Sequence, residues 1–237
     1  MLRIFYAIVK DFPDVIALIR KGHDAKRHPE RHSTEEDYKT LLHYIGVLQK
    51  TAHITTIVTG TENLPQEGSY VMFPNHQGKY DGIGLIGAHE KPCTVVIDAK
   101  RSRFPIVSEF ITLIHGFRLD RTSMRSQFEG MSAIVDEIRA GKRFIVFPEG
   151  IYHKNHNNVL AFRPGAFKSA IRAKCPIVPV ALVDSYKVFE FNSIKPVQSQ
   201  VHFLKPITYD EYKDMTSQQI ADKVREAIVE KIVSVVS

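Results

Sequence analysis

The sequence predicts an α/β fold, a mixed, largely parallel sheet covered by helices, with an N-terminal helical appendage. Short runs rich in β-branched and aromatic residues recur after residue 53, each bounded by Gly, Pro or Asn. Helical patterns lie between several of these runs, whereas the segment before them carries helical patterns only. Strands that alternate with helices indicate such a sheet, with functional groups on the loops at the strand ends. We therefore predict amphipathic helices over residues 1–53 and one α/β domain over residues 54–237.

The first 22 residues carry apolar side chains at helical spacing. These are Leu2, Phe5, Tyr6, Val9 and Phe12, and the basic residues that could meet anionic headgroups are Arg3, Lys10, Arg20 and Lys21. Charged residues and Pro13 break the apolar run, so it is shorter than the roughly 20 residues of a membrane-spanning helix and unlike a cleavable signal peptide. Two interpretations stay open: a helix in the membrane interface, or a helix that covers the protein's own core.

Apolar periodicity predicts three further helices. The first spans about residues 35–53 and is capped by Ser33 or Thr34. The second spans residues 123–140, ends at Gly141, and has an apolar face of Met124, Phe128, Met131, Ile134, Val135 and Ile138. The third begins near residue 216. The residues on its core-facing side are Ile220, Val224, Ala227, Ile228, Ile232 and Val235.

Six segments are predicted to be strands because they are short, β-branched or aromatic, and bounded by turn residues. They are HITTIVTG (53–60), SYVMF (69–73), CTVVID (93–98), RFIVF (143–147), PIVPVALV (176–183) and VHFL (201–204). The polar residues that follow these segments are therefore the first place to look for chemistry.

Composition limits the partners of the chain. With 43% apolar and 24% charged residues and no repeats, it is an ordinary globular protein. A net charge of +6 favours anionic partners: nucleic acid, acidic lipid, phosphorylated metabolites or an acidic protein. No nucleic-acid-binding motif is recognised, so we expect no nucleic-acid partner. Cys93 and Cys175 lack CxxC-type spacing, which fits a reducing cytosol, and we expect both to be small core residues.

The segment FPNHQGKYDGIGL, residues 73–85, places a histidine and a carboxylate five residues apart after an apolar run. In a continuous helix His76 and Asp81 would lie about 140° apart around the axis and could not pair. Pro74 ends the strand and Gly78 permits a turn, so the loop can fold Asp81 back toward His76. A carboxylate on one imidazole nitrogen leaves the other free to accept a proton from a hydroxyl. The alternative is a surface histidine, with Asp81 capping the next helix.

Other patterns that carry chemistry are weaker. His153 and His156 are three residues apart, but no Cys or carboxylate nearby completes a ligand set, so we expect no metal site. The sequence has no GxSxG elbow and no Walker-type phosphate loop. These absences argue against a serine hydrolase of the α/β-hydrolase type and against a nucleotide triphosphatase.

Four blocks, in order, resemble the glycerolipid acyltransferase family, the 1-acylglycerol-3-phosphate (lysophosphatidic acid) acyltransferases and their relatives. NHQGKYD is similar to the family's NHxxxxD block, and LDR, FPEG and IVPV are similar to its next three blocks, within about residues 55–185. The resemblance implies an enzyme of EC class 2.3.1 that moves a fatty acyl group from an acyl thioester to the hydroxyl of 1-acylglycerol 3-phosphate. The product would be phosphatidic acid, in phospholipid biosynthesis. No cofactor is implied, because acyl-CoA or acyl carrier protein brings the thioester as a co-substrate.

The resemblance also implies roles for the matching residues. His76 would be the general base on the acceptor hydroxyl and Asp81 would orient it. Lys100 and Arg121 match basic positions of the family and would bind the acceptor's phosphate, one as a point charge and the other as a bidentate fork.

The third block departs from the family after its glycine. Glu149 would lie in the acceptor site, accepting a hydrogen bond from a hydroxyl or holding an arginine, and Gly150 would let the backbone approach closely. The usual FPEGTRS is FPEGIYHK here, so Tyr152 stands where the family has Arg. If that Arg holds the acceptor's phosphate, then Lys154 or Arg163 substitutes for it, or the acceptor differs.

The implied partners are a membrane surface with its lysophospholipid acceptor, and acyl-CoA or acyl carrier protein. The implied location is the cytoplasmic face of the membrane, as a peripheral or monotopic protein. Two alternatives remain: an acyltransferase for another lysophospholipid or for glycerol 3-phosphate, and a catalytically silent membrane-binding module that has kept the fold.

Overall fold

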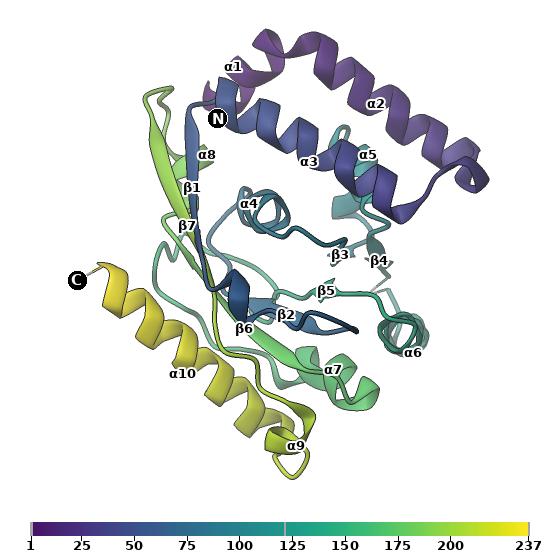
Figure 1. The fold of residues 1–237 in the computed structure, drawn as a ribbon, viewed down its shortest axis with the longest axis vertical. Helices are drawn as coiled ribbons and strands as arrows, with labels where there is room; N and C mark the ends of the chain where they lie inside the picture. Colours follow the sequence, from purple (N-terminus) through teal and green to yellow (C-terminus); the bar gives the residue numbers. More distant parts are fainter. Residues whose placement is uncertain (1, 121, 237) are drawn as a thin grey trace.

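A computed structural model describes residues 2–120 and 122–236 of the chain. Within them seven strands form one sheet in the order β1-β7-β6-β2-β5-β3-β4 (Figure 1). In chain order the strands are β1 (Ile54–Thr59), β2 (Val71–Pro74), β3 (Thr94–Asp98), β4 (Phe117–Leu119), β5 (Phe144–Ile145), β6 (Ile177–Val183) and β7 (Val197–Phe203). Neighbouring strands are parallel except β6 and β7, which are antiparallel. The predicted mixed, largely parallel sheet is confirmed.

Helices cover both faces of this sheet. One face carries α1 (Leu2–Lys10), α2 (Phe12–Arg27), α3 (Thr34–Thr51), α4 (Asp81–Gly87) and α5 (Val107–Leu113), above the sheet in Figure 1. The other carries α6 (Met124–Arg139), α7 (Lys168–Ala173) and α10 (Ser217–Val236). Two short helices, α8 (Tyr186–Glu190) and α9 (Tyr209–Tyr212), precede and follow β7, and the 3-10 turns are η1 (Pro29–Arg31), η2 (Thr61–Asn63), η3 (Arg101–Arg103) and η4 (Pro164–Phe167).

Alternate residues of the central strand β2 enter different cores. Met72 joins a cluster that includes Leu41 of α3 and Leu85 of α4. Val71 and Phe73 point the other way, into a cluster built with α6, α7 and α10. Successive side chains of a strand alternate between its faces, so one buried apolar run serves both layers of helices. This packing fixes β2, and with it the loop that follows β2.

The N-terminal helices are part of this packing. Leu18 and Ala25 of α2 and Tyr38 of α3 belong to the same buried cluster as Met72. The division of the chain after residue 53 stays a prediction. No helix among the described residues is long and apolar enough to span a membrane.

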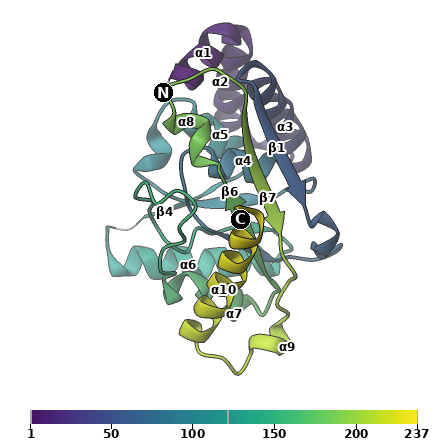
Figure 2. The same cartoon turned by 90° about the vertical axis from the view of Figure 1, so that its left-hand side faces the viewer.

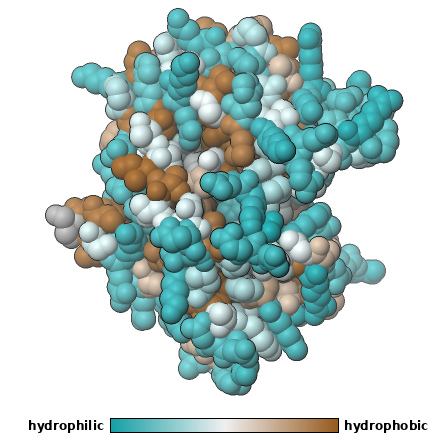
Figure 3. All heavy atoms as spheres, viewed as in Figure 1, coloured by the Kyte–Doolittle hydropathy of each residue, from teal (hydrophilic) through white to brown (hydrophobic). Residues whose placement is uncertain are grey.

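Helix α1 has one buried and one exposed side. Its exposed apolar side chains, with Phe12 at the start of α2, are Leu2, Phe5, Val9 and Phe12. The expectation that Arg3 could meet headgroups is wrong, because its side chain is 2% exposed. Its guanidinium donates to the carbonyl oxygens of Ala52, Val188 and Lys195. In Figure 3 hydrophilic side chains dominate the face viewed, with hydrophobic ones between them, including some over the N-terminal helices at the top.

Most predicted elements are present with small shifts at their ends. Ser33 caps α3 by accepting a hydrogen bond from the N–H of Glu36. The structure adds β4, which pairs with β3.

The predicted apolar face of α6 is wrong at its start, since Met124 is 88% and Phe128 is 63% exposed. The apolar pattern runs along the whole helix, whereas the buried residues of α6 are Ile134, Val135 and Ile138. Figure 2 shows β1 and β7 side by side at the other edge of the sheet.

Candidate active site

Three adjacent strands end at one place. The central strand β2 is parallel to β5 on one side and to β6 on the other. The segments after their carboxyl ends begin at Asn75, Val146 and Asp184. Loops at the carboxyl ends of parallel strands form the crevices in which α/β proteins bind ligands. The residues predicted from the NHQGKYD and FPEG segments therefore meet at this edge.

His76 and Asp81 are in contact. The Nδ1 atom of His76 lies 2.7 Å from Oδ2 of Asp81. A carboxylate only accepts hydrogen bonds, so Nδ1 carries a proton, and in the neutral imidazole Nε2 then has the free lone pair. The expected turn is present: β2 ends at Pro74, and α4 begins at Asp81 itself. The helix therefore starts after the histidine, and the 140° separation of a continuous helix does not arise.

The carboxylate of Asp81 is buried and fully hydrogen-bonded. Its Oδ2 also accepts from the backbone N–H groups of Gln77 at 2.6 Å and Gly78 at 2.9 Å. Its Oδ1 accepts from the hydroxyl of Ser185 at 2.5 Å. The side-chain oxygen of Gln77 accepts from the backbone N–H of Ser185 at 3.0 Å. These bonds fix the plane of the carboxylate and thereby the direction in which it holds His76.

Two aromatic rings enclose the imidazole of His76. The ring centre of Phe147 lies 4.3 Å away, and that of Tyr152 lies 4.7 Å away in an edge-on arrangement. The His76 side chain is still 16% exposed, so the imidazole is accessible from outside. Burial raises the pKa of Tyr152, and the negative charge of Asp81 adds to this. The phenol is therefore neutral at ordinary pH, and the wall beside His76 carries no positive charge at this position.

Glu149 hydrogen-bonds the backbone of the loop that carries His76. Its Oε1 accepts a hydrogen bond from the backbone N–H of His76 at 3.0 Å, and the residue is 4% exposed. Its Oε2 has no hydrogen-bond partner among the described residues. Burial raises the pKa of Glu149 to about 7, against the hydrogen bond from the His76 backbone that lowers it. The predicted placement of Glu149 in an acceptor site stays a prediction; the described contact is with the backbone of the candidate base.

Gly150 completes the turn after Glu149. Its φ is 78°, a left-handed value that favours glycine. A Cβ at this position would lie 3.0 Å from Cζ of Arg163. The close approach expected at Gly150 is therefore made by an arginine of this chain, and a role in contacting substrate stays a prediction.

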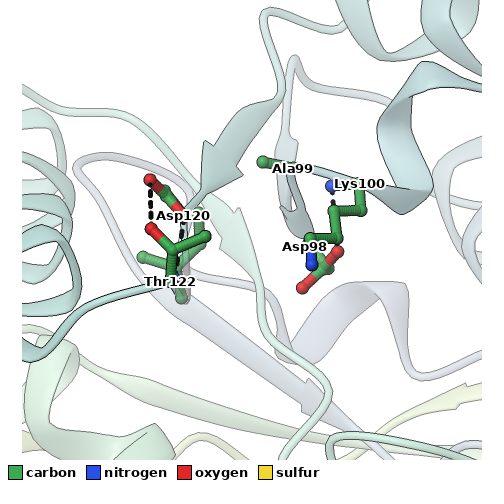
Figure 4. A pocket seen from close by; sticks show the side chains of 6 residues that line it. Asp98, Ala99, Lys100, Asp120 and Thr122 are labelled. Atoms are coloured by element: carbon green, nitrogen blue, oxygen red, sulfur yellow. Dashed lines mark hydrogen bonds between the residues drawn. The ribbon is translucent and has the colours of Figure 1, made fainter.

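The binding of phosphate by Lys100 stays a prediction. Lys100 follows β3 and lines a small pocket of about 100 Å³ with Asp98 and Asp120. In Figure 4 Asp98 and Lys100 stand on one side of this pocket, and Asp120 and Thr122 on the other. Hydrogen bonds from the backbone and side chain of Thr122 lower the pKa of Asp120, so an anion here would meet carboxylates. Arg121 lies outside the described residues.

Sequence reasoning missed the residues that hold the pair in place. Ser185 is one, and Asn155 is another, donating from its side-chain amide to the carbonyl oxygen of His76 at 3.2 Å. Ser185 follows a buried strand, which was an available signal, but its relevance depends on the strand order that sets β6 beside β2. Among the residues the structure describes, no group of three His, Cys, Asp or Glu side chains is arranged to hold a metal ion.

Comparison with known proteins places the chain among acyltransferases. A model of the Acyltransferase family matches residues 55–183. A 1-acyl-sn-glycerol-3-phosphate acyltransferase of Saccharomyces cerevisiae is 30% identical over 185 residues, 74% of this chain and 59% of the yeast protein. One of Borreliella burgdorferi is 29% identical over 188 residues, 76% of this chain and 73% of that protein. The match thus spans about six tenths of the yeast relative's length.

A solved structure shows the same fold. The crystal structure of the 1-acyl-sn-glycerophosphate (LPA) acyltransferase PlsC from Thermotoga maritima superposes with a TM-score of 0.72. The superposition covers 98% of each chain at 17% sequence identity. The N-terminal helices are included in this coverage, so they are part of the shared architecture.

Proposed function

This chain belongs to the Acyltransferase family, and from that premise we propose that it transfers a fatty acyl group from an acyl thioester to the hydroxyl of 1-acylglycerol 3-phosphate. The product is phosphatidic acid. The acyl donor is acyl-CoA or acyl carrier protein, and no cofactor takes part. The relatives from yeast and Borreliella carry this activity in their names. The observation that carries the proposal is the hydrogen bond between His76 and Asp81 at the carboxyl edge of the central strand.

In the proposed mechanism, His76 acts as the general base. Its free Nε2 accepts the proton of the acceptor hydroxyl, and the oxygen attacks the carbonyl carbon of the thioester. The new C–O bond forms, and the C–S bond breaks when the tetrahedral intermediate collapses. The leaving thiolate takes the proton back from the imidazolium. Asp81 stabilises that imidazolium while it exists. A thioester is already activated, so no covalent acyl-enzyme is needed.

We propose that the protein works at a membrane surface, on its cytoplasmic face, as a peripheral or monotopic protein. The exposed apolar residues of α1 support this, since Phe5 is 66% and Val9 is 58% exposed. An amphipathic helix of this kind buries its apolar side in the interface of headgroups and acyl chains. The net charge of +6 adds attraction to anionic lipid. The lipid acceptor resides in the same interface.

The test is a release assay for free thiol with purified protein and vesicles. The acceptors are 1-acylglycerol 3-phosphate, other lysophospholipids and glycerol 3-phosphate, each with acyl-CoA and with acyl carrier protein. We expect thiol release with formation of phosphatidic acid, identified by mass spectrometry. His76→Ala removes the base and should abolish turnover, whereas His43→Ala, an exposed histidine on α3, should not.

Absence of turnover with every acceptor and both donors would contradict the proposal. Vesicle flotation run in parallel separates the remaining possibilities. If wild type and His76→Ala both bind vesicles and neither releases thiol, the chain is a membrane-binding module. Turnover with a different acceptor only would retain the mechanism and change the substrate.

A further inference from the structure

The guanidinium of Arg163 lies directly on the backbone of Gly150. A Cβ at residue 150 would come within 3.0 Å of Cζ, 3.1 Å of Nε and 3.2 Å of Nη1 of Arg163. The backbone N–H of Arg163 donates to the carbonyl oxygen of Pro148 at 3.0 Å. Both the backbone and the side-chain end of Arg163 are therefore placed against the turn that contains Glu149. The same Glu149 hydrogen-bonds the backbone of His76.

This guanidinium is available for a ligand. The Arg163 side chain is exposed, and it makes no hydrogen bond or ion pair with the residues that the structure describes. Two other arginines are already committed: Arg3 donates to three carbonyl oxygens, and Arg225 donates to the carbonyl oxygens of Val159 and Leu160. A guanidinium presents five N–H donors and no acceptor, in a fork that fits two oxygens of a phosphate.

Two other groups named by the sequence are poorer sites for an anion. Tyr152, whose ring contacts His76, is a neutral phenol. Lys100 lines a pocket together with the carboxylates of Asp98 and Asp120. Among the described residues, Arg163 combines a charge without an acidic partner and a direct packing contact with the Glu149–Gly150 turn.

We propose that Arg163 binds the phosphomonoester of the acceptor, and that the missing side chain of Gly150 makes room for its guanidinium. This rests on the proposed function, in that the acceptor hydroxyl lies at His76. In 1-acylglycerol 3-phosphate the free hydroxyl and the phosphate are on adjacent carbons, so the phosphate site must be near the base. The phosphomonoester of coenzyme A, by contrast, lies at the far end of the pantetheine arm from the thioester. The acceptor is therefore the source of the anion.

Chemical protection tests the binding without requiring turnover. Phenylglyoxal modifies exposed arginines, and peptide mapping by mass spectrometry reports Arg163 separately from Arg172, an exposed arginine on α7. With 1-acylglycerol 3-phosphate in micelles at ten times its Kd, modification of Arg163 should slow about tenfold. Arg172 should react at its unprotected rate. The comparison ligands are monoacylglycerol, which lacks the phosphate, and coenzyme A.

Each result of the protection experiment decides the proposal. Protection by the phosphate-bearing acceptor alone supports it, even if the wild-type protein shows no turnover. Equal protection by monoacylglycerol means that lipid merely covers the arginine, and the proposal is overturned. Protection by coenzyme A and not by the acceptor assigns Arg163 to the donor and also overturns it. No protection by any ligand has the same consequence.

Kinetics of variants give the second test. Arg163→Gln should lower kcat/KM for 1-acylglycerol 3-phosphate by about 10- to 100-fold, through KM, because a charge-assisted hydrogen bond is lost. The KM for the acyl thioester should not change. Arg163→Lys keeps the charge without the fork and should recover part of the loss. Arg172→Gln is the matched control and should behave as wild type. An unchanged acceptor KM in Arg163→Gln would contradict the proposal.

Discussion

The imidazole of His76 and the carboxylate of Asp81 are 2.7 Å apart because the chain turns through Gln77 and Gly78 before helix α4 begins. The backbone N–H groups of that turn donate to the same carboxylate oxygen that receives the histidine. These hydrogen bonds position the carboxylate of Asp81, and the same bonds stabilise the turn. The turn spans residues 76–81, and the hydroxyl of Ser185 donates to the other oxygen of the same carboxylate.

Asp81→Asn should lower kcat by about 10³- to 10⁴-fold with little change in KM, since an amide cannot hold the required tautomer or stabilise the imidazolium. The measurement is thiol release at saturating donor and acceptor. Thermal unfolding of the same variant checks that the fold is retained. A variant with more than a tenth of wild-type kcat would show that Asp81 only caps α4.

Ser185→Ala should lower kcat about tenfold, because the Oδ1 atom of Asp81 loses its hydrogen bond from the hydroxyl. The acceptor KM should stay constant, since Ser185 is buried and acts only through Asp81. Ser169→Ala removes a buried hydroxyl that bonds to the backbone of Ala166, outside the site, and serves as the control. Equal kcat values for the two variants would contradict a positioning role.

Glu149→Gln should make stability less dependent on pH. Burial raises the pKa of Glu149 to about 7 from its ordinary value of 4.5. Between these values the native chain keeps the proton that the unfolded chain has lost. The free energy of unfolding therefore falls as pH rises through this window, by up to about 3 kcal/mol. Urea unfolding at about pH 5 and about pH 8 measures the difference, which should shrink in the amide variant. An unchanged difference would show that Glu149 titrates normally.

Arg3→Leu should lower the free energy of unfolding by about 3 kcal/mol, because three buried carbonyl oxygens lose their donor. Those carbonyls lie before β1 and on either side of the 191–194 segment, so the bonds join α1 to two distant parts of the chain. The measurement is urea unfolding, with Arg20→Leu on the exposed side of α2 as control. Equal stability of the two variants would mean that the Arg3 bonds are replaced by water.

Tyr152→Ala should lower kcat by about 2- to 10-fold, as the edge-on contact that restrains His76 is lost. Tyr152→Phe keeps the ring and should stay close to wild type. Comparison of the two kcat values separates the ring from the hydroxyl. If Tyr152→Phe lowers kcat as much as Tyr152→Ala does, the hydroxyl itself takes part in the reaction, and the packing explanation is wrong.

Local patterns predicted much of the fold because strands and helices follow from short-range periodicity. The Ser33 cap of α3, the end of β2 at Pro74 and the buried stripe of α10 were all visible in a few neighbouring residues. The exposed start of α6 was not, since an apolar stripe does not show how far the surface beneath it extends. The burial of Arg3 could not be predicted either. An arginine is expected to be exposed, and the three carbonyl oxygens that accept its hydrogen bonds are distant in the sequence.

The sequence by itself predicted the N-terminal helices, three further helices and six of the seven described strands, and it allowed the His76–Asp81 turn. These features depend on residues within a few positions of one another. The sequence also determined the family, through four blocks in order. Only the tertiary structure decided which side chains surround that pair. Ser185 is 104 residues from Asp81, and Glu149 is 73 residues from His76. They meet because hydrogen bonding between strands sets β5 and β6 beside β2, and that pairing is not encoded in any local pattern.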